Sequence, residues 1–225
     1  MDARRPQRAR KESRLMLEIS TIGQSGLSRP IKPEVIDQFE IELVRTLDHY
    51  QKMVALRAMT FMAEQDCPFD EEYDGNDLCG CHLLAFKDGQ PIATLRLRWF
   101  SGFGKVERVC VAPAHRGSPV VKVMLAAAFE LAARKGYRRM IAQIQARLWP
   151  LWSRTLTCRR LQDRPRIFFS DFEYYEIEIP LAAHPDAIRP TTDPYQMIRP
   201  EGAWDNPGVL DASSSRGGDL REVAA

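Results

Sequence analysis

A short loop between a predicted strand and a predicted helix contains residue types that bind phosphate. In the loop APAHRG, Arg116 and Gly117 stand directly before a helix that is expected to begin near Ser118. The first turn of a helix carries backbone N–H groups without partners and the positive end of the helix dipole. Together with the Arg116 cation, these groups suit a phosphate. An ordinary connection between two elements would have a similar sequence.

A second candidate site centres on an arginine. Arg57 falls on the apolar face of a predicted helix, between Val54 and Phe61. A guanidinium in such a setting is costly unless a carboxylate meets it. The acids expected to meet it are Asp74, Asp77 and Glu107. Two interpretations stay open: an ion pair that fastens the helix to a sheet, or a functional network.

A metal site is not expected. Cys79, Cys81 and His82 are close in sequence, but strand alternation places His82 on the opposite face from the two cysteines, and no second ligand pair follows. The five cysteines are an odd number without regular spacing, which is typical of reduced thiols in the cytoplasm.

Periodicity and turn residues predict an α/β fold with a mixed, mainly antiparallel central sheet and helices on both faces. Strands are expected at 39–44, 81–86, 92–100, 105–111, 139–145 and within 166–180, and helices at 48–65, 118–135 and 148–156. Asp48 is the predicted N-cap of the first helix. Helix 118–135 is expected to cross over between two strands of the sheet.

Composition divides the chain into three parts. Residues 1–37 are predicted to be a basic, flexible leader with a short strand at 15–19, and residues 38–182 a single folded domain. Residues 183–225 are rich in Pro, Gly and Ser and predict a disordered tail. The longest apolar segment, 120–133, is interrupted by Lys122 and Glu130, so neither a membrane span nor export is expected.

Charge is unevenly distributed although the net charge is only +2. Residues 134–166 include many basic residues and one acid, Asp163. After residue 166, acidic residues outnumber basic ones. This pattern indicates either a solvated surface or a docking site for an acidic partner. Nucleic-acid binding through the Arg-rich leader is a minor alternative.

The segment KVERVCVAPAHRGSPVVKVMLAAAFELAARKGYRR resembles the donor-binding motif of the GNAT acyltransferase superfamily. That motif joins an apolar strand, a V-x-P turn and a basic glycine loop to a long helix, and the order of elements from 39 to 181 is similar as well. The resemblance implies a pantetheine thioester as co-substrate and no metal. It assigns Val109 and Val111 to the thioester, and Arg116, Gly117, Ser118, Val120 and Val121 to the phosphate loop. The family's other loop glycines fall near Pro119 and Val121 here.

Shorter pieces resemble one branch of that superfamily, the autoinducer synthases and N-acyl amino acid synthases. The pieces are LRAMTFMAEQ, DEEYDGND and IATLRLR, followed by VERVCV. They imply Arg57 as a catalytic residue, and Asp74, Asp77, Arg96 and Arg108 as substrate-binding residues. Enzymes of this branch take fatty acyl groups from acyl carrier protein. Because this carrier is acidic, the basic residues 134–166 are its expected docking site.

The resulting prediction is a cytoplasmic N-acyltransferase that moves an acyl group from acetyl-CoA or another acyl-CoA to the amine of a small molecule. Glu107 is the candidate base, with a pKa expected to be raised in a closed cleft. Tyr174 or Tyr175 could protonate the departing thiolate. Two alternatives stay open: a carrier-protein-dependent N-acyl amino acid or acyl-homoserine-lactone-type synthase, and a catalytically inactive GNAT-fold binding protein.

Overall fold

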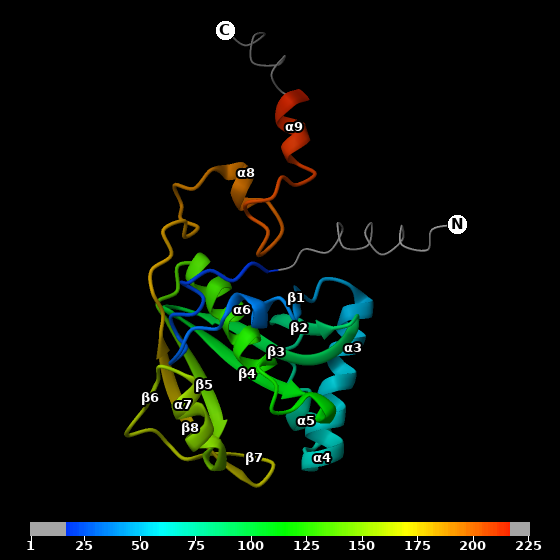
Figure 1. Ribbon diagram of the computed structural model, residues 1–225, viewed down its shortest axis with the longest axis vertical. Coiled ribbons are helices and arrows are strands. Elements are labelled where there is room, and N and C mark those ends of the chain that lie inside the picture. Colours follow the sequence, from blue (N-terminus) through cyan, green and yellow to red (C-terminus); the bar gives the residue numbers. More distant parts are fainter. Residues whose placement is uncertain (1–16, 217–225) are drawn as a thin grey trace, which may run out of the picture.

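The computed structural model describes residues 17–216 and contains one mixed sheet (Figure 1). The strands follow the order β1-β2-β3-β4-β5-β8-β6, and β7 pairs with β8. Their bounds are β1 Glu40–Leu43, β2 Cys81–Lys87, β3 Gln90–Phe100, β4 Phe103–Val111, β5 Arg139–Gln145, β6 Arg159–Arg160, β7 Ile167–Phe169 and β8 Phe172–Pro180. The helices are α2 Pro33–Ile36, α3 Leu47–Arg57, α4 Ala63–Gln65, α5 Phe69–Glu72, α6 Val120–Arg134, α7 Trp149–Thr155, α8 Pro194–Met197 and α9 Asp211–Arg216.

The sheet confirms the predicted mixed, mainly antiparallel arrangement. Strands β1 to β4 form an antiparallel meander, and β8 is antiparallel to β5. Only β4 and β5 run parallel, and α6 connects them as the predicted crossover. The Asp88–Gly89 turn joins β2 to β3, and both residues have positive φ, as a type I′ hairpin requires.

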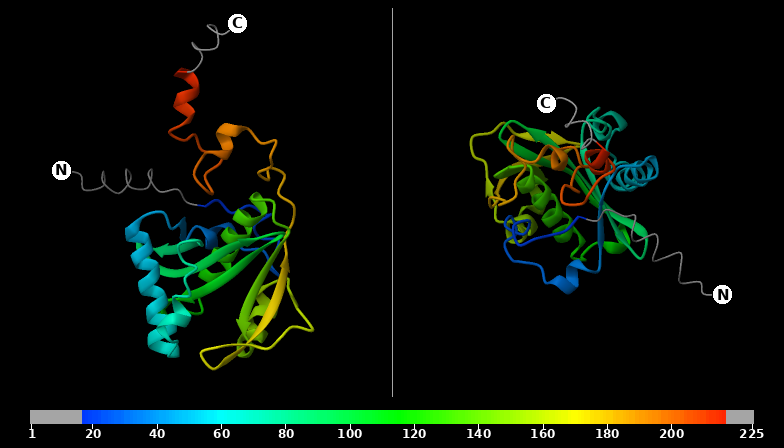
Figure 2. Two further views of the ribbon diagram at one scale, coloured as in Figure 1. Left: turned by 180° about the vertical axis from the view of Figure 1, so that it is seen from behind. Right: turned by 90° about the horizontal axis from the view of Figure 1, so that it is seen from above.

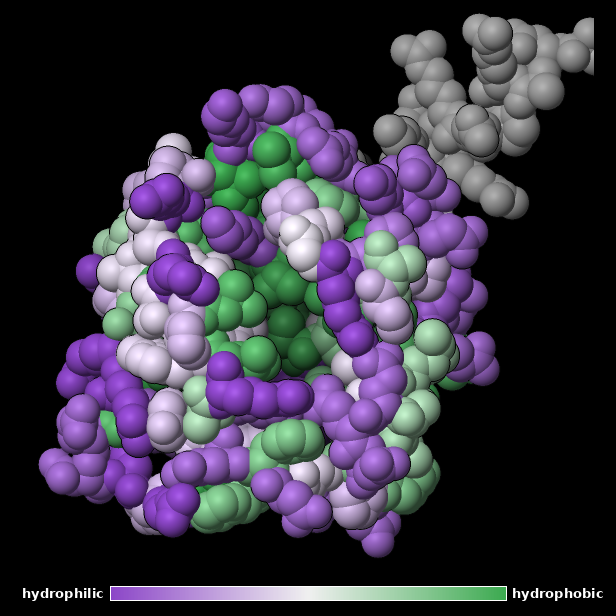
Figure 3. All heavy atoms as spheres, turned by 60° about the horizontal axis from the view of Figure 1, so that its bottom comes forward, coloured by the Kyte–Doolittle hydropathy of each residue, from purple (hydrophilic) through white to green (hydrophobic). Residues whose placement is uncertain are grey.

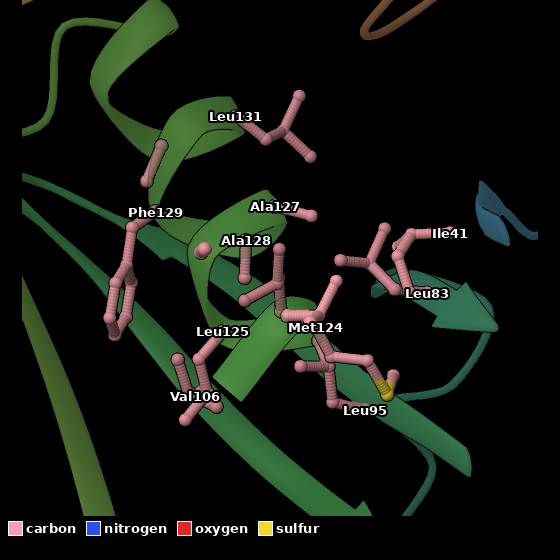
Figure 4. Close-up of a cluster of buried hydrophobic side chains, with 14 of the residues drawn as sticks. Ile41, Leu83, Leu95, Val106, Met124, Leu125, Ala127, Ala128, Phe129 and Leu131 are labelled. Carbon is pink, nitrogen blue, oxygen red and sulfur yellow. The ribbon is translucent and has the colours of Figure 1, made fainter. Parts of the chain in front are cut away.

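Helices cover both faces of the sheet, as predicted (Figure 2). The main core lies under α6, an Ala-rich helix whose residues are mostly buried. Figure 4 shows Met124 and Leu125 of α6 beside Leu95 and Val106 of the sheet, and all four are buried. A smaller cluster under α3 contains Met53, Leu84 and Cys110. Each fully buried Leu, Val, Phe or Met side chain contributes about 1.5–3 kcal/mol to folding.

The first long helix differs from the prediction at both ends. Its N-cap is Thr46, whose Oγ1 accepts a hydrogen bond from the His49 N–H at 3.1 Å, and not Asp48. Leu47, the first residue of the helix, is 71% exposed. After Arg57 the helix widens into a π-helical turn, Ala58–Met62, before it continues as α4. This turn changes the direction of the side chains within it and after it, including Phe61 and Gln65.

Segments outside the predicted 38–182 domain also pack against the core. Leu27 and Trp204 are 6% and 7% exposed and belong to the main core cluster. The Glu130 carboxylate on α6 accepts hydrogen bonds from the Ser20 hydroxyl and the Gly23 N–H, and His184 Nε2 lies 2.9 Å from its other oxygen. The predicted strand at 15–19 begins outside the described residues, and residues 17–20 have no regular structure.

Two expected absences can be examined in the described part of the chain. None of the helices between residues 17 and 216 combines the length and the apolar character that a membrane crossing requires. Within the same residues, His, Cys, Asp and Glu side chains form no group of three that could hold a metal ion.

Candidate active site

The site is built where the two parallel strands diverge. Among the described residues, β4 and β5 pair only from Gly104 and Met140 to Val106 and Ala142, although both strands continue to Val111 and Gln145. The divergence of β5 from the meander is visible in Figure 2. Beyond Val106, the β5-facing edge of β4 is therefore open.

A bulge in β4 accompanies this divergence. Thr94 of β3 pairs with Cys110, whereas Arg96, two residues later, pairs with Glu107, so β4 has one extra residue in this stretch. Arg108 takes up the extra residue with a left-handed backbone, φ 51°. An extra residue bends a strand and increases its twist. At this bulge five successive residues of β4, 105–109, line one cavity.

This cavity has a volume of about 370 Å³ and passes between the two strands. Its polar part includes Asp74, Arg96 and Glu107, on the α3 side of the sheet. Its apolar part lies toward α6 and α7 and is lined by Val106, Leu125, Ile144, Trp152, Leu156 and Ile179. Figure 3 shows a hollow at this end of the molecule, with hydrophobic side chains at the bottom and hydrophilic ones around the rim.

Arg57 is fully buried and makes two ion pairs. Its Nε lies 2.5 Å from Glu72 Oε1, and its Nη1 lies 2.5 Å from Asp77 Oδ1. Burial alone would lower the pKa of Arg57, but the two carboxylates outweigh this effect and raise it. The guanidinium is therefore a permanent cation that fastens α3 to the loop before β2.

Arg96 forms the second centre of the network. Its guanidinium lies 2.7 Å from Asp74 Oδ2, 2.8 Å from Asp77 Oδ1 and 2.5 Å from Glu107 Oε2. The same Asp77 oxygen accepts from Arg57, so Asp77 joins the two arginines. Burial would raise the pKa of Asp74, but hydrogen bonds from Arg96 and from the Asn76 N–H hold it well below its usual range.

Sequence reasoning missed Glu72. Of the three acids expected to meet Arg57, only Asp77 does so, whereas Asp74 and Glu107 pair with Arg96. Glu72 takes the remaining place, on a short helix, α5, that was not predicted, and its other oxygen lies 3.2 Å from Arg108 Nε. The acidic run DEEYDGND was the available signal, but it does not say which of its acids turns inward.

Glu107 lines the cavity, but the prediction of a raised pKa is wrong. Lys105 Nζ lies 2.6 Å from its Oε1, and Arg98 is 3.7 Å from the same oxygen. Burial would raise the pKa of Glu107, yet Lys105 and Arg96 outweigh burial and lower it. The side chain is thus a carboxylate at neutral pH and a weak proton acceptor.

The predicted phosphate loop lies beside the cavity and does not line it, whereas Val109 does. Arg116 Nε donates to the Val111 carbonyl at 3.2 Å, and Arg116 Nη2 lies 2.6 Å from Glu64 Oε2. Gly117 has φ 80°, and a side chain there would meet open space. The helix itself begins at Val120, after Pro119 as N-cap, so no side chain caps its first N–H groups. Val120 is buried, and the neighbouring Val121 is partly buried.

The uneven charge of the chain is partly balanced within the molecule. Arg164 and Arg166 lie 3.4 Å and 3.0 Å from Glu176 and Glu173, which belong to the acidic stretch that follows them. Glu178 lies between Arg139 and Arg159 in the same manner. These pairs leave less free positive charge for an acidic partner than the sequence alone indicates.

Comparison with known proteins gives three findings. Residues 50–154 match the model of the acetyltransferase (GNAT) family. The chain is 29% identical to an uncharacterized N-acetyltransferase, YjcF, of Bacillus subtilis over 99 residues, which are 44% of this chain and 71% of that protein. A crystal structure of an acyl-CoA N-acyltransferase from Pseudomonas aeruginosa superposes with a TM-score of 0.56 and 25% identity, over 63% of this chain and 99% of the other.

The branch suggested by the short sequence pieces also has a structural neighbour. FeeM, an N-acyl amino acid synthase from uncultured soil microbes, superposes with a TM-score of 0.53 over 63% of this chain and 90% of that protein. The two sequences are only 8% identical, so the likeness concerns the fold alone.

Proposed function

Because residues 50–154 of this chain match the model of the GNAT acetyltransferase family, we propose that it transfers an acyl group from an acyl-CoA or acetyl-CoA to the amine of a small molecule. One observation carries the proposal: β4 and β5 separate after Val106 and Ala142, and a cavity passes between them. A thioester in this cavity would lie between an open strand edge and a buried polar network.

The donor occupies the open edge of β4 in this proposal. Backbone N–H groups around Val109 polarise the thioester carbonyl, as the donors of an oxyanion hole do. The pantetheine arm follows β4 past Val111 to the loop Arg116–Val121, whose free helical N–H groups hold phosphate. Arg116 would exchange its pair with Glu64 for the phosphate, and both side chains are exposed enough to allow this change.

The acceptor amine occupies the polar part of the cavity. Asp74, Arg96 and Arg108 border this part, while Arg57 and Asp77 hold Arg96 in position from behind. Because Glu107 is ionised, we assign it to orienting the amine through its negative charge, directly or through water. The proton of the attacking amine then passes to solvent.

The experiment is a transfer assay that measures free thiol with matched acetyl-CoA, longer acyl-CoA and acyl-carrier thioesters and a panel of amines. We expect amine-dependent thiol release by the wild-type protein, and a loss of about 10²-fold or more in Glu107→Gln. Equal background rates in wild type, Glu107→Gln and Arg57→Ala with every donor would overturn the proposal and favour an inactive binding protein.

A second candidate is a carrier-protein-dependent synthase of N-acyl amino acids or related lactones. Its support is the phosphate loop, where Pro119 and Val121 stand near the positions of family glycines and hinder close approach of a pyrophosphate. Carrier-bound pantetheine has a single phosphate and needs less room. The same assay separates the two candidates, because this one requires that only the carrier form reacts.

A further inference from the structure

Acyl transfer leaves a thiolate, and we propose that Tyr174 protonates it, with Gln145 as the positioning residue that directs the Tyr174 hydroxyl into the cavity. This inference rests on the proposed function and deepens it. Its support is a hydrogen-bond arrangement at the end of β5 that fixes which atoms donate and which accept.

Tyr174 lies at the mouth of the diverging strands. In the antiparallel register it faces Gln145, the last residue of β5, and it lines the same cavity as Val109. The ring of Phe169 from β7 packs edge-on against the Tyr174 ring, with centroids 5.0 Å apart. The phenol is therefore held on a strand and borders the same cavity as the open edge of β4, where the thioester is proposed to lie.

The contacts of Gln145 determine its orientation. Arg147 Nε lies 2.7 Å from one end of the side-chain amide, and a guanidinium can only donate, so this end is the oxygen. The amide nitrogen at the other end donates to Gln65 Oε1 at 2.9 Å and to Tyr174 Oη at 3.1 Å. An amide group has two hydrogens, and both are used.

Tyr174 is consequently the acceptor in its contact with Gln145, and its own hydrogen is free for another partner. Among residues 17–216, Gln145 provides the only hydrogen bond recorded for this hydroxyl. The Tyr174 hydroxyl accepts a hydrogen bond from Gln145 and lines the cavity. Its own hydrogen can therefore be donated to a group bound there, such as the thiolate sulfur.

Burial favours the protonated state of both the Tyr174 phenol and the departing thiol. It raises the pKa of Tyr174, and the hydrogen bond from Gln145 offsets only part of this effect, so the phenol keeps its hydrogen at neutral pH. A thiolate formed in a buried place suffers the same penalty. Burial disfavours the charged thiolate relative to S–H, so a proton donor beside the sulfur assists its departure.

The step balances without a further reactant. The amine nitrogen bonds to the carbonyl carbon, the C–S bond breaks, and its electron pair stays on sulfur, which takes the hydrogen of Tyr174. The nitrogen loses one proton to solvent, and the tyrosinate takes one proton from solvent. The products are an amide and a free thiol.

Tyr175, the neighbouring residue, provides the matched control. Its ring packs against the main core and lies under the Arg160 guanidinium, 3.3 Å from ring centroid to Cζ. It is not one of the cavity residues. Removing its hydroxyl changes the same chemical group at the next position of the strand without changing the cavity.

The test compares two donors with the same acyl group: the alkyl thioester of CoA and an aryl thioester, whose thiolate leaves without a proton. We expect Tyr174→Phe to lower kcat about 10²-fold or more with the CoA donor and less than about threefold with the aryl donor. Gln145→Leu should lose about tenfold with the CoA donor alone, and Tyr175→Phe should match wild type with both. Thermal melting of each variant checks the fold.

Equal losses with both donors in Tyr174→Phe would overturn the inference, because they would indicate a role in binding or carbonyl polarisation. An unchanged rate with the CoA donor would overturn it as well. If the wild-type protein releases thiol with neither donor, the proposed function fails and this inference fails with it.

Discussion

Individual charges in the buried network depend on one another. Asp77 Oδ1 accepts from Arg57 and from Arg96, and Glu72 lies between Arg57 and Arg108. A buried ion pair adds little stability by itself, but removing one partner leaves an uncompensated charge in the interior. The network therefore fixes the relative positions of α3, α5 and the sheet more than it strengthens the fold.

Replacing Arg57 by Met should expose this dependence. The variant keeps the apolar stem but leaves Glu72 and Asp77 without their shared cation, so we expect the free energy of unfolding to fall by about 3–5 kcal/mol. Urea denaturation measures the change. Lys52→Met, which breaks the exposed pair with Asp48 and removes the ammonium 5.9 Å from the centre of the Phe86 ring, should keep a midpoint close to that of wild type. Equal midpoints for Arg57→Met and wild type would contradict the assignment of Arg57 to a buried pair.

Acid should destabilise the protein through the three carboxylates of the network whose pKa is lowered. The pKa values of Asp74, Asp77 and Glu107 are lower in the folded protein than their reference values of 3.8 and 4.5. Groups with a lowered folded pKa contribute stability that is present above the unfolded pKa and lost as the pH falls through the folded one. We expect urea midpoints that fall below about pH 4.5 and a flatter profile for Asp74→Asn. A midpoint that rises between pH 4.5 and pH 3 would contradict this prediction.

At the scale of helices and strands, the sequence predicted the elements whose formation depends on residues close together in the chain. Strand 139–145 agrees with β5, and helix 118–135 with α6, because alternation and a long apolar stripe are properties of neighbouring residues. The first N-cap was placed two residues late, since Asp and Thr are both good caps and both occur there.

Features that depend on distant residues had no such signal. The bulge at Arg108 is occupied by a residue other than glycine, and the separation of β4 from β5 depends on pairing between elements. For the site, the predicted residues Glu107, Arg96, Asp74, Arg108 and Val109 meet at one cavity. Glu72 was missed because the acidic run does not say which of its acids turns inward, and the contacts of Gln145 were missed because Gln65 and Tyr174 are far along the chain.

Filling the gap between the strands should separate function from stability. Ala142 is the last residue of β5 that pairs with β4, and it lines the cavity. In Ala142→Leu the larger side chain enters existing space, so we expect stability to change by less than about 1.5 kcal/mol. The value of kcat/KM for the thioester should fall at least about tenfold, and Ala142→Val should fall between this variant and wild type. Wild-type kcat/KM in Ala142→Leu would show that the donor does not use the gap.

At the scale of the whole molecule, α6 holds together segments from both ends of the described chain. Its Glu130 binds Ser20 and Gly23 on one side and His184 on the other. Gly202, with φ 73°, approaches Leu17 and Leu43 so closely that a Cβ atom there would come within 2.8 Å of either side chain. Figure 1 shows the C-terminal segment with α8 at one end of the molecule, and the hollow in Figure 3 opens at the opposite end.

Trp204 tests whether this end is part of the folded unit in solution. It is 7% exposed, packs in the main core, and has Lys135 Nζ 6.0 Å above its ring. We expect Trp204→Ala to lower the free energy of unfolding by about 3 kcal/mol or more, with kcat/KM unchanged well below the midpoint, because the cavity is remote. Tyr195→Ala removes a ring that is 37% exposed and should cost clearly less. If Trp204→Ala unfolded at the wild-type urea concentration, the segment beyond residue 182 would not contribute to the core, and the predicted boundary at 182 would also be the boundary of the cooperative unit.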